Sequence, residues 1–256
     1  MTLGFVGTGH ITVAMVEGLC SAPVPGERIV VSPRNAENAA MLAGRFATVS
    51  VAPDNQGVVD ASDIVFLAVR PPVASEIVGA LHFRPEQTVI SLVALHPREE
   101  MRALTQPASA LVRAVPLPSA ARRLGPIAYF PRNETVEALL ARVGTPVVAP
   151  DEAAFHRLWS LTGLISPFAA LIEEWQGWAE AGGVGREAAE QYVRAFVHCL
   201  ADMAQDLPPA ELARRAATPG GINEQALRIL RETDGLAPFR QALDSVFARM
   251  NAPKPR

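Results

Sequence analysis

The stretch LGFVGTGHITVAMVEGL, residues 3–19, sets the expectation for the fold. It begins with a short apolar run of strand length, turns at Gly7 and Gly9, and continues as an amphipathic helical pattern. The first glycine allows a tight turn, the second lets the backbone approach a pyrophosphate, and the start of the helix faces that anion. Thr12 stands at the third glycine position, so the pattern is GxGxxT. We interpret it as a dinucleotide-binding turn; a mere tight turn is the alternative.

The same alternation of strand and helix patterns continues through residues 1–150. Near-continuous apolar runs of strand length are LGFV, RIVV, TVSV, DIVFLAV, TVISLV and ALVRAV, followed by IAYF and TPVVA. Helical patterns lie between them at 10–22, 35–45, 72–81, 97–105 and 134–143. Apolar strands that alternate with helices are typical of a parallel, doubly wound sheet that is buried on both faces. The predicted fold class is therefore α/β.

The pattern changes at Asp151, where an acidic first turn indicates the start of a helix. Apolar positions then recur at helical spacing over 165–181 and 185–206, and no strand pattern follows residue 150. The sequence predicts a domain at 1–150 and an all-helical domain at 151–256, with a frayed tail at 251–256.

Composition excludes several classes of protein. The 256 residues are 49% hydrophobic and 19% charged, with a net charge of −3 and no block of Lys or Arg, which disfavours a nucleic-acid or anionic-membrane surface. No apolar run approaches the roughly 20 residues of a membrane span. Met1 and Thr2 lead directly into the first apolar run without a basic region or cleavage site, so we expect no targeting segment. Cys20 and Cys199 lie in apolar helical patterns without metal-ligand spacing. We expect a soluble, cytoplasmic protein without a metal site.

The end of the second strand, VVSPRN, indicates which dinucleotide binds. An NAD enzyme usually carries Asp or Glu there to accept from the ribose 2′-hydroxyl. This chain has Ser32 and Arg34, and a guanidinium can bind a 2′-phosphate bidentately. The prediction is NADP(H); a solvated turn arginine is the alternative.

Taken in order, four segments resemble the pyrroline-5-carboxylate reductase family. They are GFVGTGH at 4–10, VVSPRN at 30–35, FLAVRPP at 66–72 and ATPGGIN at 217–223. The stretch AEAGGVGREAAEQYVRAF also looks like that family's dimerising helices. The resemblance implies a Rossmann-type domain followed by a helical dimerisation and substrate domain, and the reduction of a cyclic imino acid to proline with NAD(P)H. It also implies a homodimer or higher homo-oligomer formed through the C-terminal helices.

The resemblance also implies the site residues. Those expected to bind the cofactor are Gly7, Gly9, His10, Ile11, Ser32, Arg34, Ala68, Val69, Arg70 and Pro71, where Arg70 stands at a position at which the family commonly has Lys. In the family, the loop matched by 217–223 holds the substrate carboxylate on a hydroxyl and on glycine amides. Thr218, Gly220, Gly221 and Ile222 are therefore expected to bind substrate. Independently, consecutive glycines before a helix can present backbone N–H groups to an anion, although a plain linker is the alternative.

The substrate side departs from the family pattern. Asn223 replaces a Thr that faces the ring nitrogen; its carbonyl oxygen can accept from a protonated imine, so Asn223 is the expected catalytic residue. Asn223 is equally suited to be the N-cap of a helix at 224–234. Leu117 replaces an amide side chain, GLISPFA at 163–169 replaces a glycine-rich helix start, and Ala94–Leu95 replaces Ala-Gly. The cofactor motifs match better than the substrate motifs.

The sequence thus predicts an NADPH-dependent oxidoreductase acting on C=N, with pyrroline-5-carboxylate as the first candidate substrate and proline biosynthesis as its role. One alternative is a divergent paralogue that reduces another imine or a ketone. A β-hydroxyacid dehydrogenase is disfavoured because the helical domain offers no clear catalytic Lys. The non-enzyme alternative is a protein that binds NADPH for sensing or assembly without turnover.

Overall fold

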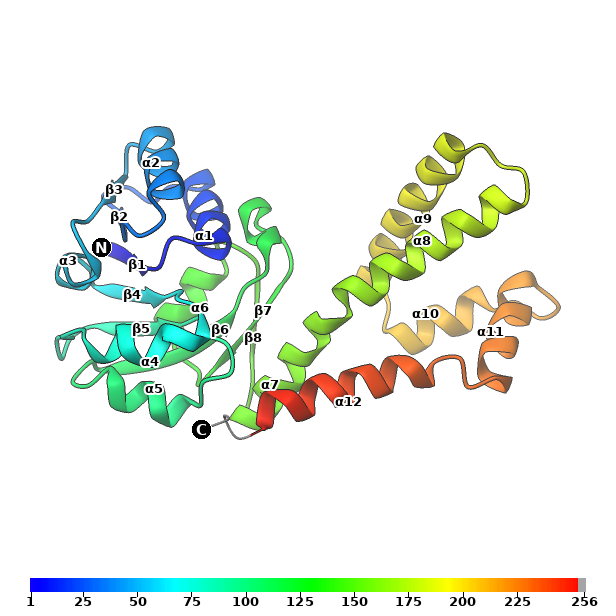
Figure 1. Cartoon of the computed structure of the whole chain (residues 1–256). Helices are drawn as coiled ribbons and strands as arrows, with labels where there is room; N and C mark the ends of the chain where they lie inside the picture. The colour runs from blue at the N-terminus through cyan, green and yellow to red at the C-terminus, as the bar shows by residue number, and fades with distance from the viewer. Residues whose placement is uncertain (253–256) are drawn as a thin grey trace. The chain divides into compact units, whose positions relative to one another are not determined.

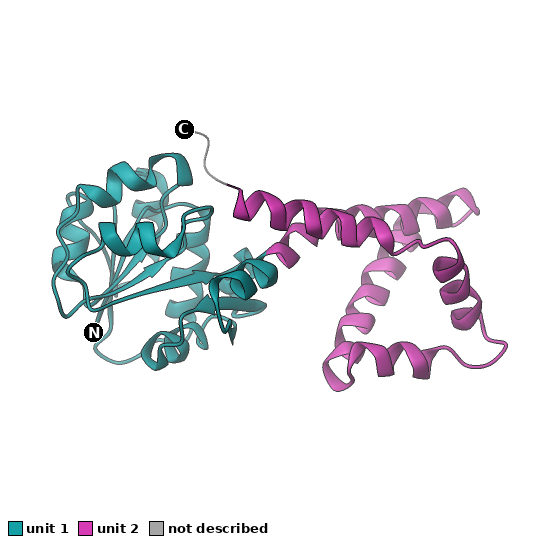
Figure 2. Ribbon diagram, turned by 90° about the horizontal axis from the view of Figure 1, so that it is seen from below, with its two compact units in different colours: residues 1–159 teal, residues 160–256 magenta. Residues whose placement is uncertain are grey.

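The computed structural model describes residues 1–252 and divides the chain into two compact units (Figure 2). Unit 1 is Met1–Trp159, and unit 2 begins at Ser160. The strands end at Val148, but the following helix α7 (Glu152–Ser160) packs on unit 1 through Phe155, so the division falls after residue 150. Of the expected tail at 251–256, Asn251 ends the last helix and residues 253–256 lie outside the described part.

Unit 1 is built on one eight-stranded sheet, in the order β3-β2-β1-β4-β5-β6-β7-β8 (Figure 1). The strands are β1 (Thr2–Val6), β2 (Arg28–Val31), β3 (Val49–Val51), β4 (Ile64–Leu67), β5 (Thr88–Ser91), β6 (Ala110–Val115), β7 (Pro126–Phe130) and β8 (Thr145–Val148). The chain reverses its winding direction between β1 and β4, which confirms the doubly wound, Rossmann-type architecture.

One strand pairing differs from the expected parallel sheet. β6 and β7 are antiparallel, whereas all other neighbouring strands are parallel. A parallel pair needs a long crossover, usually a full helix. Only the short 3-10 turn η1 (Pro118–Arg122) lies between β6 and β7, so the chain returns in the opposite direction.

Helices cover both faces of the sheet. In unit 1 they are α1 (His10–Ser21), α2 (Ala36–Arg45), α3 (Asn55–Ala61), α4 (Pro71–Gly79), α5 (Arg98–Leu104), α6 (Glu134–Leu140) and α7. One core lies under α1, α2 and α6, and the other under α3, α4 and α5. Successive strand residues alternate between these cores: Phe5 belongs to the first, where its ring stacks on Phe66 with centroids 4.4 Å apart, and Val6 belongs to the second. Burial on both faces explains why the strands read as unbroken apolar runs.

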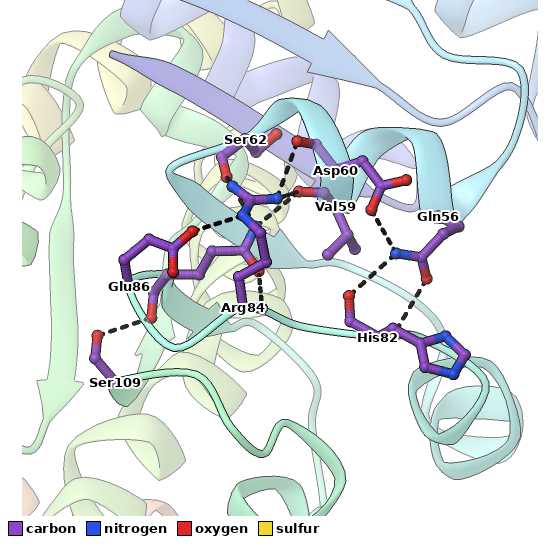
Figure 3. Close-up of polar contacts among 9 residues, drawn as sticks. Gln56, Val59, Asp60, Ser62, His82, Arg84, Glu86 and Ser109 are labelled. Carbon is purple, nitrogen blue, oxygen red and sulfur yellow. Dashed lines mark hydrogen bonds and ion pairs between the residues drawn. The ribbon is translucent and has the colours of Figure 1, made fainter.

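The edge of the sheet at which β4 and β5 begin is closed by polar side chains (Figure 3). The Arg84 guanidinium donates to the carbonyl oxygens of Asp60 and Ser62 at 2.9 and 3.0 Å, at the C-terminal end of α3. The buried Gln87 amide donates to the Val59 and Ser62 carbonyl oxygens at 2.7 and 2.8 Å. Carbonyl groups at a helix end have no partner within the helix, so these donors satisfy them.

Helix α7 is attached to the sheet by a buried arginine. Arg113, on β6, is 1% exposed; it pairs with Glu152 and lies 4.8 Å over the Phe155 ring. Burial lowers the pKa of Arg113, and the Glu152 carboxylate opposes that shift. A buried charge is tolerated because it is paired and stacked.

Unit 2 is entirely helical over its described residues. It contains the short turn η2 (Leu161–Leu164) and helices α8 (Ile165–Ala181), α9 (Arg186–Asp206), α10 (Pro209–Ala216), α11 (Ile222–Glu232) and α12 (Ala237–Asn251). α8 and α9 lie side by side (Figure 1), joined by a turn in which Gly183 has φ +91°. Among the described residues of these five helices, only Ala189 and Val193 are buried, so the helices have almost no core of their own.

Candidate active site

The turn between β1 and α1 needs glycine at two positions for different reasons. Gly7 has φ +101°, and a Cβ there would lie 2.6 Å from the carbonyl oxygen of Ala68. Gly9 has φ −84°, and a Cβ there would meet no atom within 4 Å. Gly7 therefore allows the loops after β1 and β4 to touch, whereas Gly9 leaves open space at the start of α1, where a ligand can approach.

Buried hydroxyls hold this turn in place. The Thr12 hydroxyl donates to the Gly7 carbonyl oxygen at 2.6 Å, so the residue at the third fingerprint position stabilises the loop from within. From β2, the Ser32 hydroxyl accepts from the Gly7 N–H at 2.8 Å, and the Thr8 hydroxyl donates to the Ser32 carbonyl oxygen at 2.6 Å. The turn is thus fixed before any ligand arrives.

A cavity of about 400 Å³ lies beside this turn. Its lining consists of Gly7, Thr8, Gly9, Arg34, Asn35, Ala36, Ala68, Val69, Arg70 and Val73. Helices α1, α2 and α4 all begin at or next to these residues, so the partial positive charge of three helix N-termini meets there. Arg34 and Arg70 are exposed and have no carboxylate partner within residues 1–252. The cavity therefore suits a ligand with several negative charges.

The structure brings most of the expected cofactor residues together. Gly7, Gly9, Arg34, Ala68, Val69 and Arg70 all line the cavity. Ser32 does not: its side chain is fully buried and acts on the loop, not on a ligand as the sequence suggested. His10, Ile11 and Pro71 stand next to lining residues but do not line the cavity.

Sequence reasoning missed four lining residues: Thr8, Asn35, Ala36 and Val73. Two of them had a usable signal. Thr8 lies between the two fingerprint glycines, and Asn35 is an N-cap whose side chain accepts from the Asn38 N–H at 3.2 Å.

The loop before α11, in unit 2, is the candidate substrate loop. Gly220 has φ +73°, and a Cβ on Gly221 would lie 2.6 Å from the Thr218 hydroxyl oxygen, so both positions require glycine. The Gly221 N–H donates to the Thr218 carbonyl oxygen at 2.9 Å, and the Gly220 N–H donates to the Glu224 carboxylate at 2.7 Å. The expected anion-binding amide of Gly220 is therefore engaged by a carboxylate of the chain itself.

Asn223 is not the N-cap of this helix, which corrects one of the two roles considered for it. α11 begins at Ile222, with Gly221 at the N-cap and no side-chain cap. Asn223 lies in the first turn, is exposed, and makes no side-chain hydrogen bond to residues 1–252. Ile222 is 83% exposed. Both side chains are free to meet a ligand or another chain.

No group of three or more His, Cys, Asp or Glu residues able to hold a metal ion occurs within residues 1–252. No helix in the same range has the length and apolar character needed to cross a membrane.

Comparisons with known proteins match the two parts of the chain separately. Residues 2–95 match the family described as NADP oxidoreductase coenzyme F420-dependent, and residues 152–252 match the family described as pyrroline-5-carboxylate reductase dimerisation. The protein is thus of the class that joins an oxidoreductase-type dinucleotide-binding domain to a helical dimerisation domain.

Relatives cover nearly the whole chain. A pyrroline-5-carboxylate reductase of Pseudomonas aeruginosa is 29% identical over 96% of this chain and 94% of its own length. One from Corynebacterium melassecola is 28% identical over 97% of each chain. The solved structure of a pyrroline-5-carboxylate reductase from Coxiella burnetii superposes with a TM-score of 0.84 at 25% identity, covering 97% of this chain and 96% of that one. Along nearly its whole length the chain is therefore similar to pyrroline-5-carboxylate reductases, and its residues 152–252 match the dimerisation part of that family.

Proposed function

We propose that this protein reduces pyrroline-5-carboxylate to proline with NADPH. The observation that carries the proposal is the likeness along nearly the full length of both chains to reductases of that name, which includes the dinucleotide-binding part and the helical part. A role in proline biosynthesis and a cytoplasmic location follow from this activity as further expectations.

The cofactor would lie in the cavity beside the β1–α1 turn. Gly9 leaves room for the pyrophosphate at the start of α1, and Arg34, next to the end of β2, is placed to bind a 2′-phosphate. Arg70 adds a second unpaired cation on the opposite side of the turn, beyond β4. The cofactor supplies a hydride; this chain's residues bind and orient it.

The substrate carboxylate would be held by the loop at 218–222. Thr218 offers a hydroxyl, and the first-turn amides of α11 have no side-chain cap, so they can donate to an anion. A carboxylate at Gly220 must displace Glu224 from that amide. Asn223 would accept from the N–H of the protonated imine through its side-chain oxygen.

The chemistry needs positioning more than acid catalysis. The hydride adds to the imine carbon while the C=N π electrons become the nitrogen lone pair, and the nitrogen keeps the proton it carried. The product is the cyclic secondary amine. A protonated imine is already electrophilic, so holding donor and acceptor in line supplies most of the acceleration.

The test is oxidation of NADPH by the purified protein with pyrroline-5-carboxylate, compared with an Asn223→Thr variant. Turnover by both proteins supports the proposal. Binding of NADPH without oxidation by either protein would refute it in favour of a sensing or assembly role.

Reduction of another imine or of a ketone is the second candidate, and Asn223 favours it. Thr can relay a proton through its hydroxyl, whereas Asn can only donate from its amide or accept. Turnover that appears only in Asn223→Thr would support this second candidate.

We also propose that the protein is a homodimer or higher homo-oligomer through unit 2. Trp178 and Tyr192 are 81% and 73% exposed, on helices that bury almost nothing between them. Exposed aromatic surface on a helical unit with almost no core requires a partner. Light scattering should give at least a dimer, and Trp178→Arg should weaken it; a monodisperse monomer would contradict the proposal.

A further inference from the structure

Leu95 has an unfavourable backbone conformation, and its own side chain makes no contact that offsets the cost. Its φ is +60°, in the left-handed region that residues with a Cβ rarely adopt. Within residues 1–252 only Arg123 and Asp234 share this property among non-glycine residues. Arg123 donates to the Arg142 carbonyl oxygen at 3.1 Å, and Asp234 pairs with Arg240 at 3.0 Å. The Leu95 side chain is apolar and 38% exposed, so neither a polar contact nor full burial offsets its backbone cost.

The residues around Leu95 hold it in this conformation. The ring of the next residue, His96, is 4% exposed; its Nδ1 lies 3.2 Å from the Ala94 carbonyl oxygen. His96 Nε2 lies 3.3 Å from the hydroxyl oxygen of Ser75 on α4. The loop is therefore tied on both sides of Leu95, and the strain is held by its surroundings.

Leu95 follows β5 at the same edge of the sheet as the cavity. In the strand register, Val6 of β1 pairs with Leu67 of β4, and Leu67 pairs with Ser91 of β5. The loops after these three parallel strands therefore leave the sheet side by side. Ligands of doubly wound sheets bind at this edge.

The direction of the cofactor places its reactive end near β5. With a 2′-phosphate at Arg34, beside β2, and the pyrophosphate at Gly9, beside β1, the other half of the dinucleotide must extend toward β4 and β5. Hydride transfer would then occur where the loop after β5 begins. This step rests on the proposed function.

We propose that Leu95 determines substrate specificity by forming an apolar wall at the acceptor end of the site. The family that the sequence resembles has glycine there, and leucine fills space that glycine leaves open. A wall of this kind favours a small ring and discriminates against an imine that is larger by one methylene group. One methylene in an apolar pocket changes kcat/KM by about tenfold or more.

The experiment compares kcat/KM of wild type and Leu95→Gly for pyrroline-5-carboxylate and for its six-membered-ring homologue. In Leu95→Gly we expect kcat/KM for the larger ring, divided by kcat/KM for pyrroline-5-carboxylate, to rise by about tenfold or more. Thermal stability should not fall, because glycine accepts a positive φ. Arg123→Gly is the matched control: it relieves a similar φ elsewhere in unit 1 and should leave the ratio unchanged. Leu95→Ala shortens the side chain as a second test. If neither Leu95→Gly nor Leu95→Ala changes the ratio of the two kcat/KM values, the proposal is overturned.

A second measurement separates failure of this proposal from failure of the proposed function. In a Cys20→Ser, Cys199→Ser background, a Leu95→Cys thiol is labelled with a maleimide, with and without saturating NADPH. If wild type reduces neither imine, the proposed function fails. Even in that case, slower maleimide labelling of the Leu95→Cys thiol in the presence of NADPH supports the placement of residue 95 beside the reactive end of the cofactor. A labelling rate that NADPH does not change overturns that placement.

Discussion

Gly7 and Gly9 stand two residues apart, and alanine at each should produce opposite defects. At Gly9, φ is already compatible with alanine, and the added methyl group meets no protein atom. Alanine is a poorer N-cap than glycine, but it also restricts the unfolded chain, so the net change in the free energy of unfolding should be below about 1 kcal/mol. The methyl group would occupy space required by the cofactor pyrophosphate. NADPH should therefore bind at least about tenfold more weakly, which corresponds to about 1.4 kcal/mol.

At Gly7 the same substitution should destabilise the fold. Alanine at φ +101° is strained, and its Cβ would lie 2.6 Å from the Ala68 carbonyl oxygen, a backbone atom that cannot rotate away. Strain and overpacking together should lower the free energy of unfolding by about 2–5 kcal/mol.

The assay is urea unfolding of both variants followed by circular dichroism, with NADPH affinity measured by titration. If Gly9→Ala binds NADPH as tightly as wild type, the cavity beside the β1–α1 turn is not the pyrophosphate site. If Gly7→Ala is as stable as Gly9→Ala, the close approach of the loops after β1 and β4 does not limit residue choice.

Three further outcomes are expected. Arg34→Ala should weaken NADPH about tenfold or more while leaving NADH affinity unchanged, because only NADPH carries the 2′-phosphate; equal losses for both would exclude this role. Glu224→Gln should lower KM for pyrroline-5-carboxylate about fivefold at constant kcat, since a neutral acceptor holds the Gly220 amide less strongly; a higher KM would mean that Glu224 supports the loop. Burial and the hydrogen bond to Glu137 raise the pKa of Tyr129 to about 12. The stability from this shift is therefore present below the unfolded-state pKa of about 10 and lost as pH rises from there to about 12. In Tyr192→Phe, where Tyr129 is the sole tyrosine, phenolate absorbance should appear near pH 12, and its appearance near pH 10 would contradict the burial.

Most of the strands could be predicted because their signal is local. The runs RIVV and ALVRAV coincide with β2 and β6 to the residue, since both faces of each strand are buried beyond its first residue and the positions there are apolar or, like Arg113, packed. The antiparallel direction of β7 could not be predicted from its local run of apolar residues. It depends on the short connection through η1, and the strand itself looks the same in either direction.

The site shows the same division between local and spatial information. Gly7 and Gly9 are recognisable because a tight turn before a helix needs them in sequence. That Ser32 turns inward depends on the packing of β2 against the β1–α1 turn, which the sequence does not display. The start of α11 was predicted two residues late, at residue 224 instead of Ile222. Glu224, the third residue of that helix, was the missed signal: such a residue commonly reaches back to an amide before the helix, as it does to Gly220.

The polar closure around Arg84 and Gln87 lies where β4 and β5 begin, whereas the candidate site lies where the same strands end. A strand only four residues long thus separates a region that holds the fold from a region that binds ligand. Substitutions could accumulate at the ligand edge during divergence, including a strained residue such as Leu95, while the far edge kept the sheet intact. For a protein engineer, the two edges serve different purposes. Substitutions at the ligand edge would alter which substrate binds, and substitutions at the edge around Arg84 and Gln87 would add the stability that such changes cost.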